Sequence, residues 1–183
     1  MRKKTLLLIA PLAILTLFVV SGCGKVSEKA AEKAIEKSTN GAADVDLSTN
    51  SIRVNVNGSS WETGDSVSLP SGFPSDIYVV DGTIKVAYAN TSDKGYTVSI
   101  ETSKTPSEVQ STYNEKLTSS GWSIISTANY QGATSLQAQK DNRTISVGAS
   151  SSDGKTTATI TTYTSTETVN TNSETTNTNS ESE

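Results

Sequence analysis

Thr105–Trp122, TPSEVQSTYNEKLTSSGW, is the stretch from which we predict the fold of this chain. The Thr105 side chain can cap the backbone amide of Glu108, the Glu108 side chain can reach back, and Pro106 suits the first helical position. Apolar residues recur at every fourth position and so share one face: Val109, Tyr113 and Leu117. The stretch therefore predicts one amphipathic helix over 106–120 whose apolar face packs against another element.

Alternating apolar and polar residues on both sides of this helix predict β-strands. Two runs before it, joined by a turn at 90–95, predict a hairpin; their alternating residues are Ile84, Val86, Tyr88, Tyr96, Val98 and Ile100. After the helix, a strand begins at Trp122, and turns at 131–132, 141–142 and 152–155 separate it from three more strands. The sum predicts an α+β domain over 69–164, a β-β-α-β-β-β-β antiparallel sheet with one helix packed on one face.

The same alternation predicts the core, because a one-sided sheet turns every second side chain inward. The expected core residues are Ile84, Val86, Val98, Ile100, Val109, Tyr113, Leu117, Trp122, Leu136, Ile145, Val147, Ala158 and Ile160. Upstream, two prolines make 69–76 an irregular linker, in which we expect Phe73 to be exposed. The apolar run Ile77–Val80 predicts a short strand.

A smaller β unit is predicted over 43–68, before the linker. Val45 and Leu47 alternate with acidic residues, and a second alternating run leads into Asn57-Gly58. Asn-Gly is a strong hairpin signal because both residues accept positive φ. The segment therefore predicts two or three short strands.

Residues 23–42 are expected to form the lipid anchor and a polar helical stalk. Over 24–40, Glu and Lys recur every four residues around a narrow stripe that is mostly alanine. Such a helix is marginal alone, so it fits a stalk that lifts the domain from a membrane; a partner helix or a coiled coil is the alternative. At the other end, the Thr/Asn/Ser/Glu tail 165–183 is expected to be disordered, either as a spacer or glycosylated segment or as an inert solubilising end.

The first 22 residues have the pattern of a secretory signal peptide. A basic start, Arg2-Lys3-Lys4, precedes an apolar stretch from Leu6 to Val20, which is too short to span a bilayer comfortably. The following Val20-Ser21-Gly22-Cys23 resembles a bacterial lipobox, which more often has Leu first. The resemblance implies lipid transfer to the Cys23 thiol and cleavage after Gly22. A buried core cysteine, or an uncleaved membrane helix with an incidental cysteine, is the alternative.

The layout of residues 20–160 resembles an uncharacterised family of bacterial envelope lipoproteins. The features that carry the resemblance are the lipobox, the Glu/Lys repeat 28–37, the segment Ala43–Leu47, the linker with its two prolines, and the α+β domain with Tyr113 and Gly121-Trp122. The resemblance implies lipid anchoring at the extracytoplasmic face of a membrane. It supplies no established activity.

Composition excludes several classes of function. Residues 1–22 contain three of the 15 basic and none of the 19 acidic residues, so the rest of the chain has a net charge of −7. Nucleic acid and anionic lipid headgroups are disfavoured as partners because both need clusters of Lys and Arg. The chain has no histidine, which removes the commonest general base and metal ligand. With Cys23 lipidated no thiol remains, and we expect neither a metal nor a cofactor.

Three weaker chemical signals remain. Asp44 and Asp46 share one face of a strand, and Asp76 and Asp81 flank another, but solvated surface acids explain them better than acid–base catalysis. No calcium loop or nucleophile elbow is complete, although abundant Ser and Lys leave a Ser/Lys dyad open. Aromatic residues either line a sheet surface for glycan or peptide or pack in the core: Trp61, Tyr78, Tyr88, Tyr96, Trp122 and Tyr130.

These observations favour a membrane-tethered, non-enzymatic interaction module whose partner is an envelope protein or glycan. The first alternative is a small hydrolase that acts on envelope glycan with carboxylates or a Ser/Lys pair. The second is an inhibitor or sensor of an envelope enzyme. No residue other than Cys23 and the cleavage-site Gly22 is assigned a site role from sequence.

Overall fold

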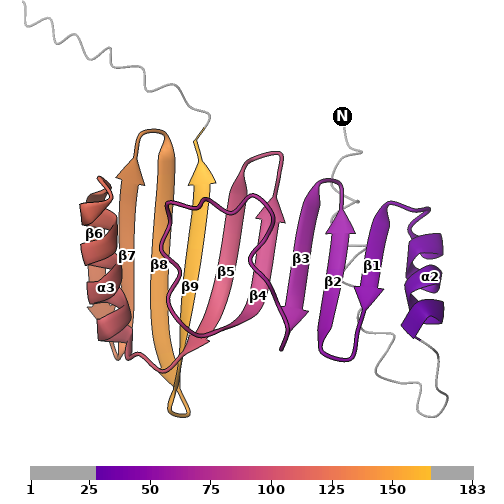
Figure 1. Ribbon diagram of the computed structural model, residues 1–183, viewed down its shortest axis with the longest axis horizontal. Coiled ribbons are helices and arrows are strands. Elements are labelled where there is room, and N and C mark those ends of the chain that lie inside the picture. The colour runs from indigo at the N-terminus through magenta and orange to yellow at the C-terminus, as the bar shows by residue number, and fades with distance from the viewer. Residues whose placement is uncertain (1–27, 166–183) are drawn as a thin grey trace, which may run out of the picture.

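The computed structural model describes residues 28–165, which form a nine-stranded antiparallel sheet with two helices (Figure 1). The helices are α2 (Glu28–Ser38) and α3 (Pro106–Ser119). The strands are β1 (Ala43–Leu47), β2 (Ser51–Val56), β3 (Ser59–Gly64), β4 (Thr83–Asn90), β5 (Gly95–Thr102), β6 (Ser123–Tyr130), β7 (Ala133–Lys140), β8 (Arg143–Ser152) and β9 (Lys155–Thr164). The predicted α+β class with an antiparallel sheet is confirmed.

Some predicted features fall outside this range. The signal peptide 1–22, the cleavage site after Gly22, the lipidation site Cys23 and all but the first residue of the tail 165–183 lie outside the described residues.

The strands occur in the order β1-β2-β3-β4-β5-β9-β8-β7-β6, so the sheet does not simply follow the chain. The last strand, β9, pairs with β5 on one side and β8 on the other. It thereby joins the strands before α3 to those after it. The predicted strand order is matched in part, because the structure adds the strands before residue 69 to the same sheet.

The N-terminal elements belong to this sheet. Strand β3 pairs with β4, so the segments divided in sequence into 43–68 and 69–164 form one continuous sheet. Helix α2, predicted as a stalk, packs against the edge strand β1, with Ala31 buried. Oε1 of Glu32 accepts a hydrogen bond of 2.8 Å from the backbone N–H of Leu47. The helix therefore satisfies part of an otherwise open sheet edge.

Helix α3 begins as its sequence predicts. The Thr105 side chain accepts a hydrogen bond from the backbone N–H of Glu108, and Oε2 of Glu108 accepts one of 2.7 Å from the backbone N–H of Thr105. This capping box satisfies two amide donors that a helix start leaves unpaired. It fixes the entry of the helix over β6 to β9.

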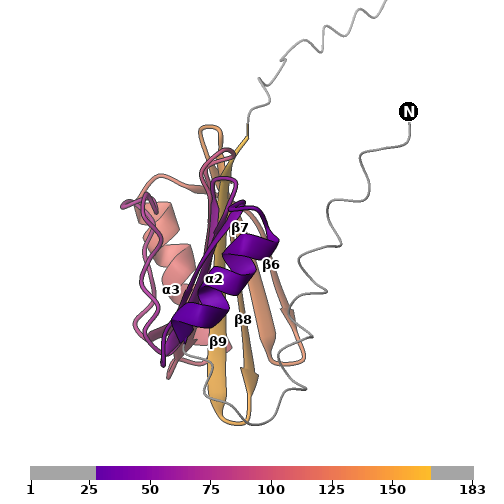
Figure 2. The same ribbon diagram turned by 90° about the vertical axis from the view of Figure 1, so that its right-hand side faces the viewer.

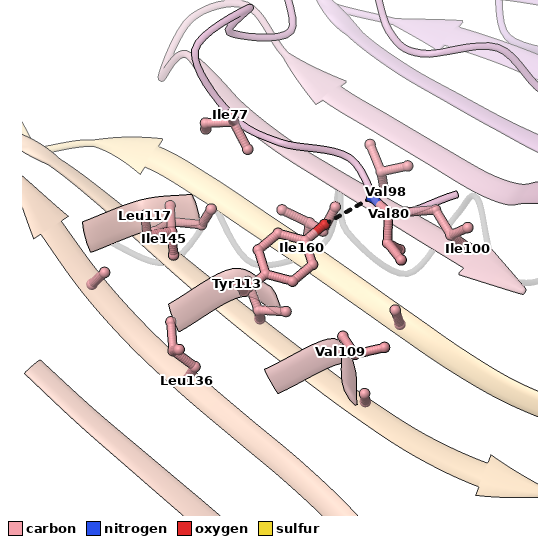
Figure 3. Close-up of a cluster of buried hydrophobic side chains, with 14 of the residues drawn as sticks. Ile77, Val80, Val98, Ile100, Val109, Tyr113, Leu117, Leu136, Ile145 and Ile160 are labelled. Carbon is pink, nitrogen blue, oxygen red and sulfur yellow. Dashed lines mark hydrogen bonds between the residues drawn. The ribbon is translucent and has the colours of Figure 1, made fainter. Parts of the chain in front are cut away.

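The core lies between α3 and the sheet (Figure 3). Eleven of the thirteen predicted core residues are buried: Val98, Ile100, Val109, Tyr113, Leu117, Trp122, Leu136, Ile145, Val147, Ala158 and Ile160. Tyr113 lies among them, fully buried, and its hydroxyl accepts a hydrogen bond of 3.2 Å from the backbone N–H of Val80. Burial raises the pKa of the Tyr113 phenol well above its ordinary value, so the hydroxyl stays protonated.

The core at β4 differs from the predicted core because this strand contains a β-bulge. The register shifts between Ile84 and Val86, so the residues after the shift change faces. Ala87 and Ala89 are buried instead, opposite Val98 and Tyr96, whereas Val86 and Tyr88 turn to the other face. Ile84, ahead of the shift, still packs against the core while only partly buried. Val86 is therefore not a core residue.

The segment 65–82 lies on the same side of the sheet as α3 (Figure 2). Ile77 and Val80 are buried, but the predicted strand at Ile77–Val80 does not form and the segment is irregular. Phe73, expected to be exposed, is half-buried and meets the Tyr96 ring edge-on, with centroids 5.9 Å apart. The apolar residues of this segment complete the core rather than extend the sheet.

An ion pair fastens this segment to β8. Nη1 and Nη2 of Arg143 donate hydrogen bonds of 2.8 and 2.6 Å to the two carboxylate oxygens of Asp76. The guanidinium also lies 5.0 Å from the ring centroid of Trp122. The hydrogen bonds from Arg143 lower the pKa of the Asp76 carboxyl below its ordinary value.

We expect Asp76→Asn to lower the free energy of unfolding at pH 7 by about 1 kcal/mol or less, since the pair is partly exposed. Because the folded-state pKa of Asp76 is depressed, its stabilisation is present above the unfolded-state pKa of about 3.9 and disappears as pH falls through the lower folded-state value. Urea denaturation at several pH values measures the difference between the wild-type chain and the variant. Asp81→Asn, at an exposed carboxylate of the same segment, is the control. A difference that persists unchanged at acidic pH would contradict this account.

Candidate functional site

The two faces of the sheet have different surroundings. The helix face, which carries Val98 and Ile160, packs against α3 and the segment 65–82. Alternate side chains point to the opposite side, which we call the open face. Among the described elements, α2 covers the open face at β1, where Ala43 and Val45 are buried. From the next strand, β2, onward neither α2 nor α3 covers the open face, and Ile52, Val56 and Trp61 are exposed there.

Apolar and aromatic side chains gather on the open face over β2 to β4. We call this set the aromatic patch; its members are Ile52, Val54, Val56, Trp61, Val86 and Tyr88. Val54, Trp61 and Tyr88 are direct cross-strand partners and so form one row. Trp61 is 39% exposed, which is unusual for so large an apolar side chain. The bulge in β4 builds this patch, because it turns Val86 and Tyr88 away from the core.

Hydroxyl and amide side chains continue the open face over β5, β9, β8 and β7. Two cross-strand sets, which we call the hydroxyl rows, are Thr97–Thr161–Ser146–Gln137 and Ser99–Thr159–Gly148–Ser135. Hydroxyl oxygens of Thr97 and Thr161 lie 3.2 Å apart, and those of Ser99 and Thr159 lie 3.0 Å apart. Nε2 of Gln137 donates a hydrogen bond of 3.2 Å to the Ser146 hydroxyl. These contacts hold the polar groups in register across the sheet.

The first hydroxyl row continues directly into the aromatic patch. Register pairs run from Trp61 through Tyr88 and Thr97 to Thr161, and then to Ser146 and Gln137. Six strands contribute one residue each, so the row spans about 24 Å at a strand spacing of about 4.8 Å. The open face is therefore an extended strip with an aromatic end and a polar end.

Charge is scarce on this face. At the open-face register positions of β2 to β9, the charged residues are Glu101 and Lys155. Near them, Nζ of Lys85 in the β4 bulge donates a hydrogen bond of 2.6 Å to Oδ1 of Asp65. Nζ of Lys155 donates a hydrogen bond of 2.9 Å to Oε1 of Glu101, which balances both charges. The surface therefore offers little to a strongly charged ligand.

The acidic residues considered in the sequence lie elsewhere. Asp44 and Asp46 are exposed and share the helix-face side of β1. Nη1 of Arg53 lies 3.9 Å from Asp46, and Nη2 lies 3.0 Å from the mostly buried carboxylate of Glu62. Arg53 and Glu62 also line a pocket of about 290 Å³ with Asn55, Ser60, Ser68, Leu69, Pro70, Ser71 and Ala87. The main charged groups of this pocket, Arg53 and Glu62, thus neutralise one another.

The sequence left open whether the aromatic residues pack in the core or line a sheet surface, and the structure shows some of each. Tyr96 and Trp122 are buried, and Tyr78 meets the Tyr113 ring at a centroid distance of 5.4 Å, so these three pack. Trp61 and Tyr88 belong to the open face, and Tyr130 is exposed at the end of β6. Sequence alone could not separate the two groups, because the separation depends on the bulge and on strand pairing.

Residues 28–165 hold neither a metal-binding cluster nor a membrane-spanning helix. No group of three or more Asp, Glu, Cys or His side chains there is arranged to hold a metal ion. Neither α2 nor α3 is long and apolar enough to cross a membrane.

Comparison with known proteins gives one finding. A family model described as START domain-like matches residues 84–156, from β4 through α3 to the start of β9. No curated protein matches the chain. The match covers α3 and the strands β4 to β8, and it leaves out β1 to β3 with Trp61 and most of β9 with Thr159 and Thr161.

Proposed function

We propose that this chain is a lipid-anchored, non-enzymatic binding module at the extracytoplasmic face of a cell membrane, and that its open face is the binding surface. The observation that carries the proposal is the exposed strip from Trp61 to Gln137, in which an aromatic patch continues into hydroxyl rows. Large apolar groups exposed beside ordered polar groups are typical of interaction surfaces.

Other observations support this role. START-like domains are generally ligand-binding rather than enzymatic, and the match spans most of the hydroxyl rows. The carboxylates that the sequence offered to a histidine-free hydrolase are all exposed, namely those of Asp44, Asp46, Asp76 and Asp81. The mostly buried carboxylate of Glu62 is paired with Arg53. The lipobox-like sequence ending at Cys23 supports the proposed attachment to a membrane.

Single-cysteine labelling tests the binding surface directly. Cys23 is the sole cysteine of the chain and has no free thiol once it is lipidated, so one introduced cysteine becomes a unique reporter. Gln137→Cys places the reporter on the open face, and Glu115→Cys places it on the exposed side of α3. Each variant is treated with a membrane-impermeant maleimide, on cells and as full-length chain purified in detergent.

We expect the open-face reporter to react at least fivefold more slowly on cells than in the purified chain, because a bound partner covers it. The α3 reporter should react at similar rates in both settings. Equal rates for both reporters would contradict the assignment of the open face. Failure of both to react on cells while both react after membrane disruption would contradict the proposed location.

A further inference from the structure

We propose that the ligand of the open face is an uncharged polysaccharide strand that lies along the row from Trp61 to Gln137, an inference that rests on the proposed function. The ligand crosses the strands of the sheet and contacts the aromatic patch and the hydroxyl rows together. Three properties of the face lead to this class of ligand.

The first property is the hydrogen-bonding capacity of the hydroxyl rows. A Thr or Ser hydroxyl has one donor and two acceptor positions. The contacts between Thr97 and Thr161, and between Ser99 and Thr159, use one donor of each pair and leave the other donor and most acceptors free for a ligand. Sugar hydroxyls also donate and accept, so each can match such a mixed row.

The second property is the aromatic end of the strip. Trp61 and Tyr88 are direct cross-strand partners on the open face, and both retain exposed surface. A sugar ring has apolar C–H faces beside its polar rim, and an aromatic side chain presents an apolar ring beside one polar group. When one pyranose stacks on this end, the next sugar units of the same chain lie over the hydroxyl rows.

The third property is the shortage of charge. A phosphorylated or acidic polymer requires unpaired Lys or Arg, and a basic peptide requires unpaired carboxylates. Lys155 is already joined to Glu101 at 2.9 Å. The neighbouring Lys85 in the β4 bulge is likewise joined to Asp65 at 2.6 Å. Length also favours a polymer, because a strip of about 24 Å offers contacts to several consecutive sugar units.

A second copy of the chain, or another apolar protein face, is the competing occupant. Such a partner would bury the aromatic patch but would leave the Thr and Ser hydroxyls without matched groups. Loss of a hydroxyl should therefore weaken the binding of a polysaccharide but strengthen the binding of an apolar protein face. Thr161→Val removes a hydroxyl from the first row at nearly constant shape, and Val suits a strand position.

The test uses full-length chain purified in detergent and three uncharged hexamers: β-1,4-N-acetylglucosamine, β-1,4-glucan and α-1,4-glucan. We expect at least one to bind, Trp61→Ala to weaken that binding at least tenfold, and Thr161→Val to weaken it about threefold to tenfold. Leu69→Ala, at an exposed apolar residue on the helix-face side, should leave it unchanged. Circular dichroism of each variant confirms that the sheet is retained.

Three outcomes would overturn the glycan assignment. They are binding of none of the hexamers, binding that is unchanged by both open-face variants, and self-association in sedimentation that Thr161→Val strengthens. In each case, slow labelling of the Gln137→Cys reporter on cells would still support the open face as the binding surface. Rapid labelling of that reporter would remove the proposed function itself, so the two failures are distinguishable.

Discussion

Replacing Tyr113 by alanine is expected to lower the free energy of unfolding by about 3–5 kcal/mol, as removal of a buried aromatic ring generally does. Tyr113 is 0% exposed and lies between α3 and the sheet (Figure 3). Its ring also meets the ring of Tyr78. A domain of this size has a total stability of about 5–15 kcal/mol, so the variant loses a large part of it. Urea denaturation followed by circular dichroism measures the change.

Two further variants separate the ring from its hydroxyl. Tyr113→Phe keeps the ring but leaves the buried N–H of Val80 without its acceptor, so we expect a smaller loss of about 1–3 kcal/mol. Glu115→Ala, at an exposed position of the same helix, should change stability by less than about 0.5 kcal/mol. If alanine at position 113 were as well tolerated as alanine at position 115, the core described above would be incorrect.

Local signals explain why much of the fold could be predicted from sequence. The capping box at Thr105 and the Asn57-Gly58 turn act within a few residues, and both form as expected, with φ of 48° and 77° at the two turn residues. The spacing of Val109, Tyr113 and Leu117 identified the buried side of α3 because helical periodicity is independent of the partner. These elements required no knowledge of tertiary structure.

The bulge in β4 could not be predicted from the alternation of apolar and polar residues. Strict alternation from Ile84 predicts Val86 and Tyr88 on the core face, but one inserted position reverses every residue after it. The residues that fill the core are instead two alanines, Ala87 and Ala89, which carry little hydrophobic signal of their own. Their burial follows from pairing with β5, a contact that sequence alone does not supply.

The candidate site was harder to predict than the fold for the same reason. A row of Thr, Ser and Gln on alternate strand positions has the composition of any solvent-facing strand. It becomes a continuous strip because β9 inserts between β5 and β8, which brings Thr97, Thr161 and Ser146 into register. Which face α3 and the segment 65–82 leave uncovered is likewise a property of the assembled sheet.

The proposed lipid anchor is tested by Cys23→Ser, for which we expect almost complete loss of the chain from the membrane fraction. Each buried CH₂ of an acyl chain contributes about 0.8 kcal/mol, and two or more chains are needed for stable anchoring. A serine cannot accept the thioether-linked lipid, so both the lipid mass and this binding energy should disappear. Fractionation with immunoblotting measures location, and intact-protein mass spectrometry measures the modification.

Ser21→Ala, which preserves a small residue in the lipobox-like sequence, should remain anchored and lipidated. Unchanged membrane retention and mass in Cys23→Ser would show that another feature of the chain holds it there.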